Sequence, residues 1–168
     1  IENADIVIRN NKIEAVGAND CPPVVVTADG LRGGAASIRG DVSSQFLSGL
    51  LMAAPYAQQP ITLNVSGTLV SIPYVDMTIK VMESFGAKAT AASDYSQITV
   101  SNGRRYRGLD YAIEPDASAA SYFFATAAIT GGRITVEGLS RKSLQGDVEF
   151  CDCLAQMGAS VEYGPDSI

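Results

Sequence analysis

The sequence predicts an α/β fold built from a repeated unit, and three observations indicate it. Helical and β-rich segments alternate along the chain, which favours helices packed on sheets. One order of elements occurs twice, so the chain holds about two units of roughly seventy residues. Two helical segments are apolar around their whole circumference, as expected of central helices buried on every side.

The repeat is clearest in two amphipathic helices, each of which follows a serine and ends before a glycine. The first covers Ser71–Phe85 and is followed by Gly86, and the second lies after Ser143 and is followed by Gly158. Glycine is the usual residue just past a helix end, so both glycines are predicted C-caps. The apolar stripes with helical spacing are Val75, Ile79, Met82 and Phe85 in the first helix, and Phe150, Cys151, Leu154 and Met157 in the second.

The other helix of each unit has apolar residues on all sides. These two segments are Gln45–Ala54 and Ser118–Ile129, and both are too short to span a bilayer. We therefore predict that both are core helices, with Leu50 and Phe123 among the buried side chains.

Short β-rich runs separate the helices and are predicted strands. The first ten residues do not fit the repeat. The predicted strands are Val24–Thr27, Ile61–Val65, Gln97–Ser101, Ile134–Glu137 and Ser160–Tyr163.

The composition argues against several classes of protein. The formal net charge is −6, whereas a nucleic-acid-binding protein normally shows a basic patch, so we expect no nucleic-acid partner. No apolar run approaches the length of a membrane span, and no signal peptide is recognisable, so no membrane partner is expected. The chain has no histidine, the commonest metal ligand, and we expect neither a metal nor a cofactor.

The cysteines indicate a reducing compartment. Cys21, Cys151 and Cys153 are an odd set without metal-ligand or redox-motif spacing. We interpret them as reduced packing thiols of a cytoplasmic protein.

The candidate binding residues stand at predicted helix starts, where free N–H groups and hydroxyls suit a phosphate. Asp41 to Gln45 precede the first apolar helix, and Asp116 opens the second. Ser71 and Ser143 stand at the starts of the amphipathic helices. Helix capping explains one serine or aspartate at each start equally well. Two adjacent serines followed by Gln45 exceed what one cap requires.

Four segments resemble signature segments of the EPSP synthase family of enolpyruvyl transferases, and they follow one another in the same order as in that family. The resemblance covers residues 11–168. The first segment contains the Ser-Ser-Gln-Phe sequence and the apolar helix after it, and the fourth ends in Gln-Gly-Asp. The four segments are Gly40–Pro55, Leu69–Thr78, Glu114–Phe123 and Ser143–Asp147.

The resemblance implies a fold of repeated βαβαββ units, three in each of two domains, with the active site in the cleft between them. It places a crossover between the domains near residues 113–115. Residues 1–113 are then part of the shikimate-phosphate-binding domain, and residues 114–168 are one unit of the second domain.

The family's reaction joins phosphoenolpyruvate to the 5-hydroxyl of shikimate 3-phosphate and releases phosphate. By resemblance, Ser43, Ser44 and Ser71 hold the shikimate phosphate, and Tyr74 lines the same pocket. Hydroxyls at helix starts are also what a phosphate requires on physical grounds.

The resemblance assigns catalytic contacts to two further residues. Gln45 reaches toward phosphoenolpyruvate or the substrate hydroxyls. Asp116 faces the cleft from the second domain, and Gln145 lines the cleft beside it as a substrate-binding residue.

Several motifs of the family that supply cations and the general acid and base are absent from the sequence. We therefore expect a piece of a longer enzyme, whose remaining units are partners of this chain, and we expect the isolated chain to be inactive. Two alternatives stay open. One is the related transferase that acts on UDP-N-acetylglucosamine, and the other is a non-catalytic interaction module that reuses the fold.

Overall fold

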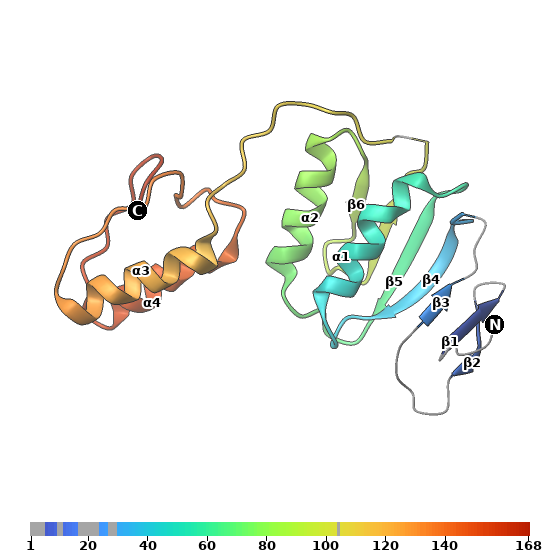
Figure 1. The fold of residues 1–168 in the computed structure, drawn as a ribbon, viewed down its shortest axis with the longest axis horizontal. Coiled ribbons are helices and arrows are strands. Elements are labelled where there is room, and N and C mark those ends of the chain that lie inside the picture. Colours follow the sequence, from blue (N-terminus) through green and yellow to red (C-terminus); the bar gives the residue numbers. More distant parts are fainter. Residues whose placement is uncertain (1–5, 10–11, 17–23, 27–29, 104) are drawn as a thin grey trace.

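The computed structural model describes residues 6–9, 12–16, 24–26, 30–103 and 105–168 (Figure 1). Three short strands come first: β1 (Ile6–Arg9), β2 (Lys12–Val16) and β3 (Val24–Val26). They form a sheet in the order β2-β1-β3, in which β1 pairs antiparallel with β2 and parallel with β3. The predicted strand at Val24–Thr27 is confirmed through Val26, and Thr27 lies outside the described residues.

A four-stranded mixed sheet follows, in the order β4-β5-β7-β6. Its strands are β4 (Gly34–Arg39), β5 (Ile61–Ser66), β6 (Ala89–Ala91) and β7 (Gln97–Val100). β4 and β5 are parallel, and β7 is antiparallel to both of its neighbours. The predictions for β5 and β7 are confirmed, whereas β4 and β6 were not predicted.

Two helices cover one face of this sheet (Figure 1). They are α1 (Ser44–Ala53), extended by a 3-10 turn at Ala54–Tyr56, and α2 (Ile72–Ser84). The hydroxyls of Ser48 and Thr78 lie 2.8 Å apart between the two helices. We call residues 30–103 the sheet module. Its fully buried side chains include Leu47, Leu51, Leu63, Val75, Ile98 and Val100.

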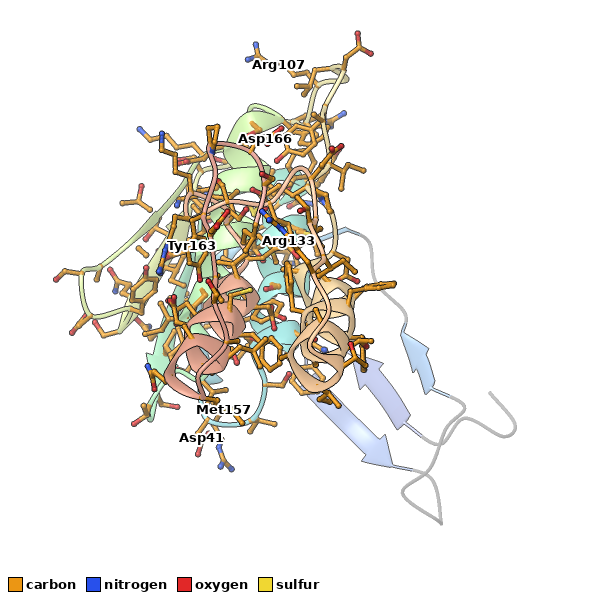
Figure 2. All side chains as sticks on the ribbon, turned by 90° about the vertical axis from the view of Figure 1, so that its left-hand side faces the viewer. Asp41, Arg107, Arg133, Met157, Tyr163 and Asp166 are labelled. Carbon is orange, nitrogen blue, oxygen red and sulfur yellow. The ribbon has the colours of Figure 1, made fainter. Side chains whose placement is uncertain are left out.

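The chain then continues to a smaller helical module, residues 114–168. It contains α3 (Ala117–Thr130), a 3-10 turn at Gly146–Glu149, and α4 (Phe150–Gln156). Figure 2 looks onto this module, where α3 and α4 lie side by side and Met157 marks the end of α4. The buried apolar residues of the module include Ala120, Phe124, Leu139, Val148 and Cys151.

The predicted ends of the amphipathic helices are confirmed. Gly86 and Gly158 directly follow the caps of α2 and α4 and have φ angles of +94° and +102°. A side chain would be strained in that left-handed conformation, so glycine ends both helices. Cys151 is buried, as predicted, but Cys153 is exposed and does not pack in the core. Cys21 lies outside the described residues.

The prediction of strands at Ile134–Glu137 and Ser160–Tyr163 is wrong for the structure. The first segment makes only one isolated antiparallel bridge, between Glu137 and Ser167. Val136 and Ile168 exchange two backbone hydrogen bonds of 2.9 and 3.0 Å beside it. A strand needs a neighbouring strand to satisfy its backbone groups, and the described part of the chain offers these segments no further one.

The prediction that both apolar helices are buried on every side is also wrong for the structure. In α1, Phe46 is 65% exposed, and in α3, Tyr122, Phe123 and Ile129 are 75%, 57% and 84% exposed. Each helix packs one face against its own module, and no described residue covers the opposite face. Among the described residues, no helix is long and apolar enough to cross a membrane.

This difference in burial predicts unequal effects of truncation. Leu51→Ala removes a side chain that is 0% exposed and should lower the free energy of unfolding by about 2–5 kcal/mol through cavity formation. Phe123→Ala should cost less than about 1 kcal/mol, because over half of that side chain already contacts solvent. Urea unfolding of both variants checks this, and equal losses would contradict the assignment of the core.

Candidate functional site

The starts of α1 and α2 lie at one edge of the four-stranded sheet. β4 leads into α1 and β5 leads into α2, and because the two strands are parallel, they end at the same edge (Figure 1). Two backbone hydrogen bonds join the connecting loops: Gly40 N–H donates to Ser66 O at 2.9 Å, and Val70 N–H donates to Gly40 O at 3.0 Å. The two helix starts are therefore held next to each other.

Ser43 and Ser44 have different roles at the start of α1. Ser43 is the N-cap, and its hydroxyl accepts a hydrogen bond of 3.2 Å from Gln45 N–H. Ser44 is the first helical residue and is only 8% exposed. Since one side chain is enough to cap the helix, the hydroxyl of Ser44 is not needed for that purpose. The side chain of Gln45 is exposed to solvent.

Ser71 at the start of α2 has an unusual backbone conformation. Its φ and ψ angles are 58° and 48°, in the left-handed region that non-glycine residues avoid. Its exposed hydroxyl does not cap α2. A strained serine with an uncommitted hydroxyl is a candidate for ligand binding rather than for helix stabilisation.

The charge beside these serines is nearly balanced. Arg39 ends β4 and donates two hydrogen bonds of 2.9 Å to the carboxylate of Asp41. The hydrogen bonds from Arg39 lower the pKa of Asp41 below its ordinary value. Both side chains are exposed, so salt and solvent screen the pair strongly.

Asp116 and Gln145 organise the start of α3 in the helical module. Asp116 is the N-cap and accepts from Ala119 N–H at 3.0 Å. The amide oxygen of Gln145 accepts from Ala117 N–H at 2.8 Å, and its amide nitrogen donates to Pro115 O at 2.7 Å. Glu114 accepts from Leu144 N–H and from the Gln145 amide. Gln145 thus joins the start of α3 to the loop before the 3-10 turn.

The two modules touch where α2 and the 3-10 turn of the helical module begin. The hydroxyl of Tyr74 donates a 2.8 Å hydrogen bond to Asp147 Oδ2. Beside it, Gly146 lies so close to Pro73 that an added Cβ would meet the proline ring at 3.1 Å. The bond to Asp147 raises the pKa of Tyr74, while Ser118 acts in the opposite direction.

The structure thus groups the predicted site residues in two sets. Ser43, Ser44, Gln45, Ser71 and Tyr74 come from adjacent helix starts of the sheet module. Asp116 and Gln145 stand on the other side of the contact between Tyr74 and Asp147. Sequence reasoning did not assign a role to Glu114 or Asp147, although both lie within segments that carry the family resemblance.

An open hollow beside α3 is separate from the serines. It is lined by the start of α3 and by the segment that follows the helix. Its lining residues are Pro115, Asp116, Ala119, Ala120, Phe123 and Ile134 to Glu137. Of the predicted site residues, Asp116 alone contributes to this hollow.

Comparison with known proteins identifies the family. The family model described as EPSP synthase (3-phosphoshikimate 1-carboxyvinyltransferase) matches residues 7–168. The chain therefore belongs to the EPSP synthase family.

Individual relatives carry the same name. The 3-phosphoshikimate 1-carboxyvinyltransferase of Vibrio atlanticus is 43% identical over 157 residues, which is 93% of this chain and 37% of that protein. The enzyme of Marinomonas sp. is 46% identical over 153 residues, 90% of this chain and 36% of that protein. The chloroplastic enzyme of Petunia hybrida is 47% identical over 150 residues, 88% of this chain and 29% of that protein. The chain thus spans roughly a third of the length of these relatives.

The different roles of Ser43 and Ser71 predict different effects on stability. Ser43→Ala should lower the free energy of unfolding by about 1 kcal/mol, because it removes the cap of α1. Ser71→Gly should be neutral or stabilise by up to about 1 kcal/mol, because glycine tolerates the left-handed conformation. Chemical denaturation measures both values. A loss of stability in Ser71→Gly that matches the loss in Ser43→Ala would contradict this division of roles.

Proposed function

We propose that this chain forms the shikimate 3-phosphate-binding part of an enzyme that transfers the enolpyruvyl group of phosphoenolpyruvate to the 5-hydroxyl of shikimate 3-phosphate. The names of the related enzymes support this reaction class. The observation that carries the proposal is the pairing of two helix starts at one sheet edge, each with a serine hydroxyl that capping does not use.

In this proposal the phosphate of shikimate 3-phosphate lies between the starts of α1 and α2. Ser44 and Ser71 donate hydrogen bonds to it, and free N–H groups of the two helix starts add to them. Ser43 contributes through the same helix start, although its hydroxyl oxygen already caps α1. Tyr74, one turn into α2, lines the same pocket.

The remaining predicted residues act toward the other reactant and the ring hydroxyls. Gln45 is exposed beside the serines, which supports its role as a catalytic contact to phosphoenolpyruvate or a substrate hydroxyl. Asp116 faces the site from the helical module, and its Oδ1 atom is engaged in capping α3. Gln145 would bind substrate while it keeps its hydrogen bonds with Pro115 and Ala117.

The larger architecture belongs to the same proposal. Residues 1–113 would form part of the shikimate-phosphate-binding domain, and residues 114–168 would form one unit of a second domain. The remaining units of the enzyme would then be the partners that cover the exposed faces of α1 and α3. We propose a cytoplasmic location, while the name of the Petunia relative specifies the chloroplast.

The isolated 168-residue chain should not catalyse the transfer. Among the described residues, Arg39 is the cation that lies close to Ser43 and Ser44 in sequence. Its guanidinium group is already paired with the carboxylate of Asp41. Catalysis of this reaction needs groups that stabilise the charge developing on two anionic substrates. Phosphate release from a mixture of shikimate 3-phosphate and phosphoenolpyruvate should therefore stay at background. Turnover by the purified chain would contradict this.

In the complete enzyme, loss of either uncommitted serine should weaken binding. Ser44→Ala or Ser71→Ala should raise the Kd for shikimate 3-phosphate by about 10- to 150-fold, because each removes a hydrogen bond to a charged phosphate. Calorimetric titration measures the change.

Ser84→Ala is the matched control. The Ser84 hydroxyl bonds Lys80 O at the opposite end of α2 and should not affect the Kd. If Ser44→Ala and Ser71→Ala bind as tightly as this control, the proposed phosphate site is wrong.

A further inference from the structure

The Tyr74 hydroxyl has one hydrogen to donate, and in the structure it gives that hydrogen to Asp147. The two residues are separated by 73 positions in sequence, and the bond measures 2.8 Å. The neighbouring contact of Pro73 with Gly146 brings the two segments close together, because an added Cβ at Gly146 would meet the proline ring at 3.1 Å. The first turn of α2 and the 3-10 turn of the helical module therefore meet at two successive residue pairs.

Asp147 makes this contact without an evident capping role. Gln145 is the N-cap of the 3-10 turn that contains Asp147, and no side-chain hydrogen bond caps this turn. Within the described part of the chain, the hydrogen bond from Tyr74 is the one found for the Asp147 carboxylate. The contact is thus specific to a tyrosine that belongs to the candidate substrate site.

An ionised carboxylate and an anionic ligand compete for the same donor. A carboxylate accepts hydrogen bonds and cannot donate them, so Asp147 offers nothing to a phosphate or carboxylate group. Its negative charge also repels such a group. An anion that approaches the Tyr74 hydroxyl therefore gains that hydrogen bond only when the Tyr74–Asp147 bond opens.

We infer that Asp147 is a positioning residue that holds Tyr74 in the ligand-free protein and that an anionic substrate displaces. This inference rests on the proposed function, because it takes the anion bound by the serines as the competitor. Substrate binding is then coupled to the contact between the two modules. Part of the interaction with the ligand is used to release Tyr74, which lowers the apparent affinity.

The experiment uses the complete enzyme and shikimate 3-phosphate, followed by amide NMR. In the wild-type enzyme, the ligand should shift the amide signals of Ser44 and Ser71, and also those of Gly146 and Asp147. Asp147→Ala should tighten binding by about 3- to 10-fold, because the exposed competing bond is gone. Asp147→Asn keeps the size of the side chain and leaves a weaker hydrogen-bond acceptor, so it should give a smaller gain in affinity. It also serves as a second variant in case Asp147→Ala fails to fold.

Two controls separate release of Tyr74 from a general effect of charge. Glu149→Gln removes an exposed carboxylate from the same 3-10 turn and should leave the Kd within about twofold of the wild-type value. In a Tyr74→Phe background, Asp147→Ala should change the Kd by less than about twofold, because the two substitutions remove the same bond.

The outcomes distinguish this inference from the function on which it rests. If the serine amides do not shift in any variant, the proposed site fails and the inference falls with it. If the serine amides shift but Asp147→Ala binds no tighter than wild type, the inference is wrong and the site stands. An equal gain from Asp147→Ala with and without Tyr74→Phe would also overturn the inference, since it would reflect charge alone.

Discussion

The parallel pairing of β4 and β5 is the constraint on which the candidate site depends. The register runs without interruption from Gly34 opposite Ile61 to Arg39 opposite Ser66. Parallel neighbours require a crossover connection, and α1 forms it. Both strands consequently end at one edge, and α1 and α2 begin there. Any change that shifted this register would separate the serines of the two helix starts.

In the proposed function, anion binding at this edge would rely on backbone N–H groups and hydroxyls more than on charge. Arg39 is paired with Asp41, so the described residues offer an anion little net positive charge at this position. Helix starts and neutral donors orient an anion well, but they neutralise it only partly. In the proposed function, this chain would therefore bind the phosphate, and the remaining units of the enzyme would supply most of the charge stabilisation.

Much of the helical structure follows from the sequence, because periodicity and glycine caps are local signals. The stripe from Val75 to Met82 and the following Gly86 define α2 without reference to the rest of the fold. Strand β4 was not predicted because Gly34 to Arg39 is rich in small residues. It is also an outer strand of the sheet, and its side chains are mostly exposed. The apolar circumference of α3 indicates burial, but it cannot reveal which surface provides that burial.

The candidate site was likewise predictable from the sequence only in part. Local sequence indicates a cap or a ligand at Ser43 and Ser44, but only the structure shows that Ser43 takes the cap. The left-handed conformation of Ser71 and the bond from Tyr74 to Asp147 depend on tertiary contacts that no sequence window contains. The roles of Glu114 and Asp147 were missed for that reason, although both lie in segments that support the family assignment.

A crystal structure of the complete enzyme with shikimate 3-phosphate bound tests the central claim most directly. The measured quantities are the distances from the ligand's phosphate oxygens to Ser44 Oγ and to Ser71 Oγ. We predict that one phosphate group lies within hydrogen-bonding distance of both hydroxyls, between the starts of α1 and α2. A phosphate that contacts neither hydroxyl, or two hydroxyls that point to different faces of the sheet edge, would contradict the account.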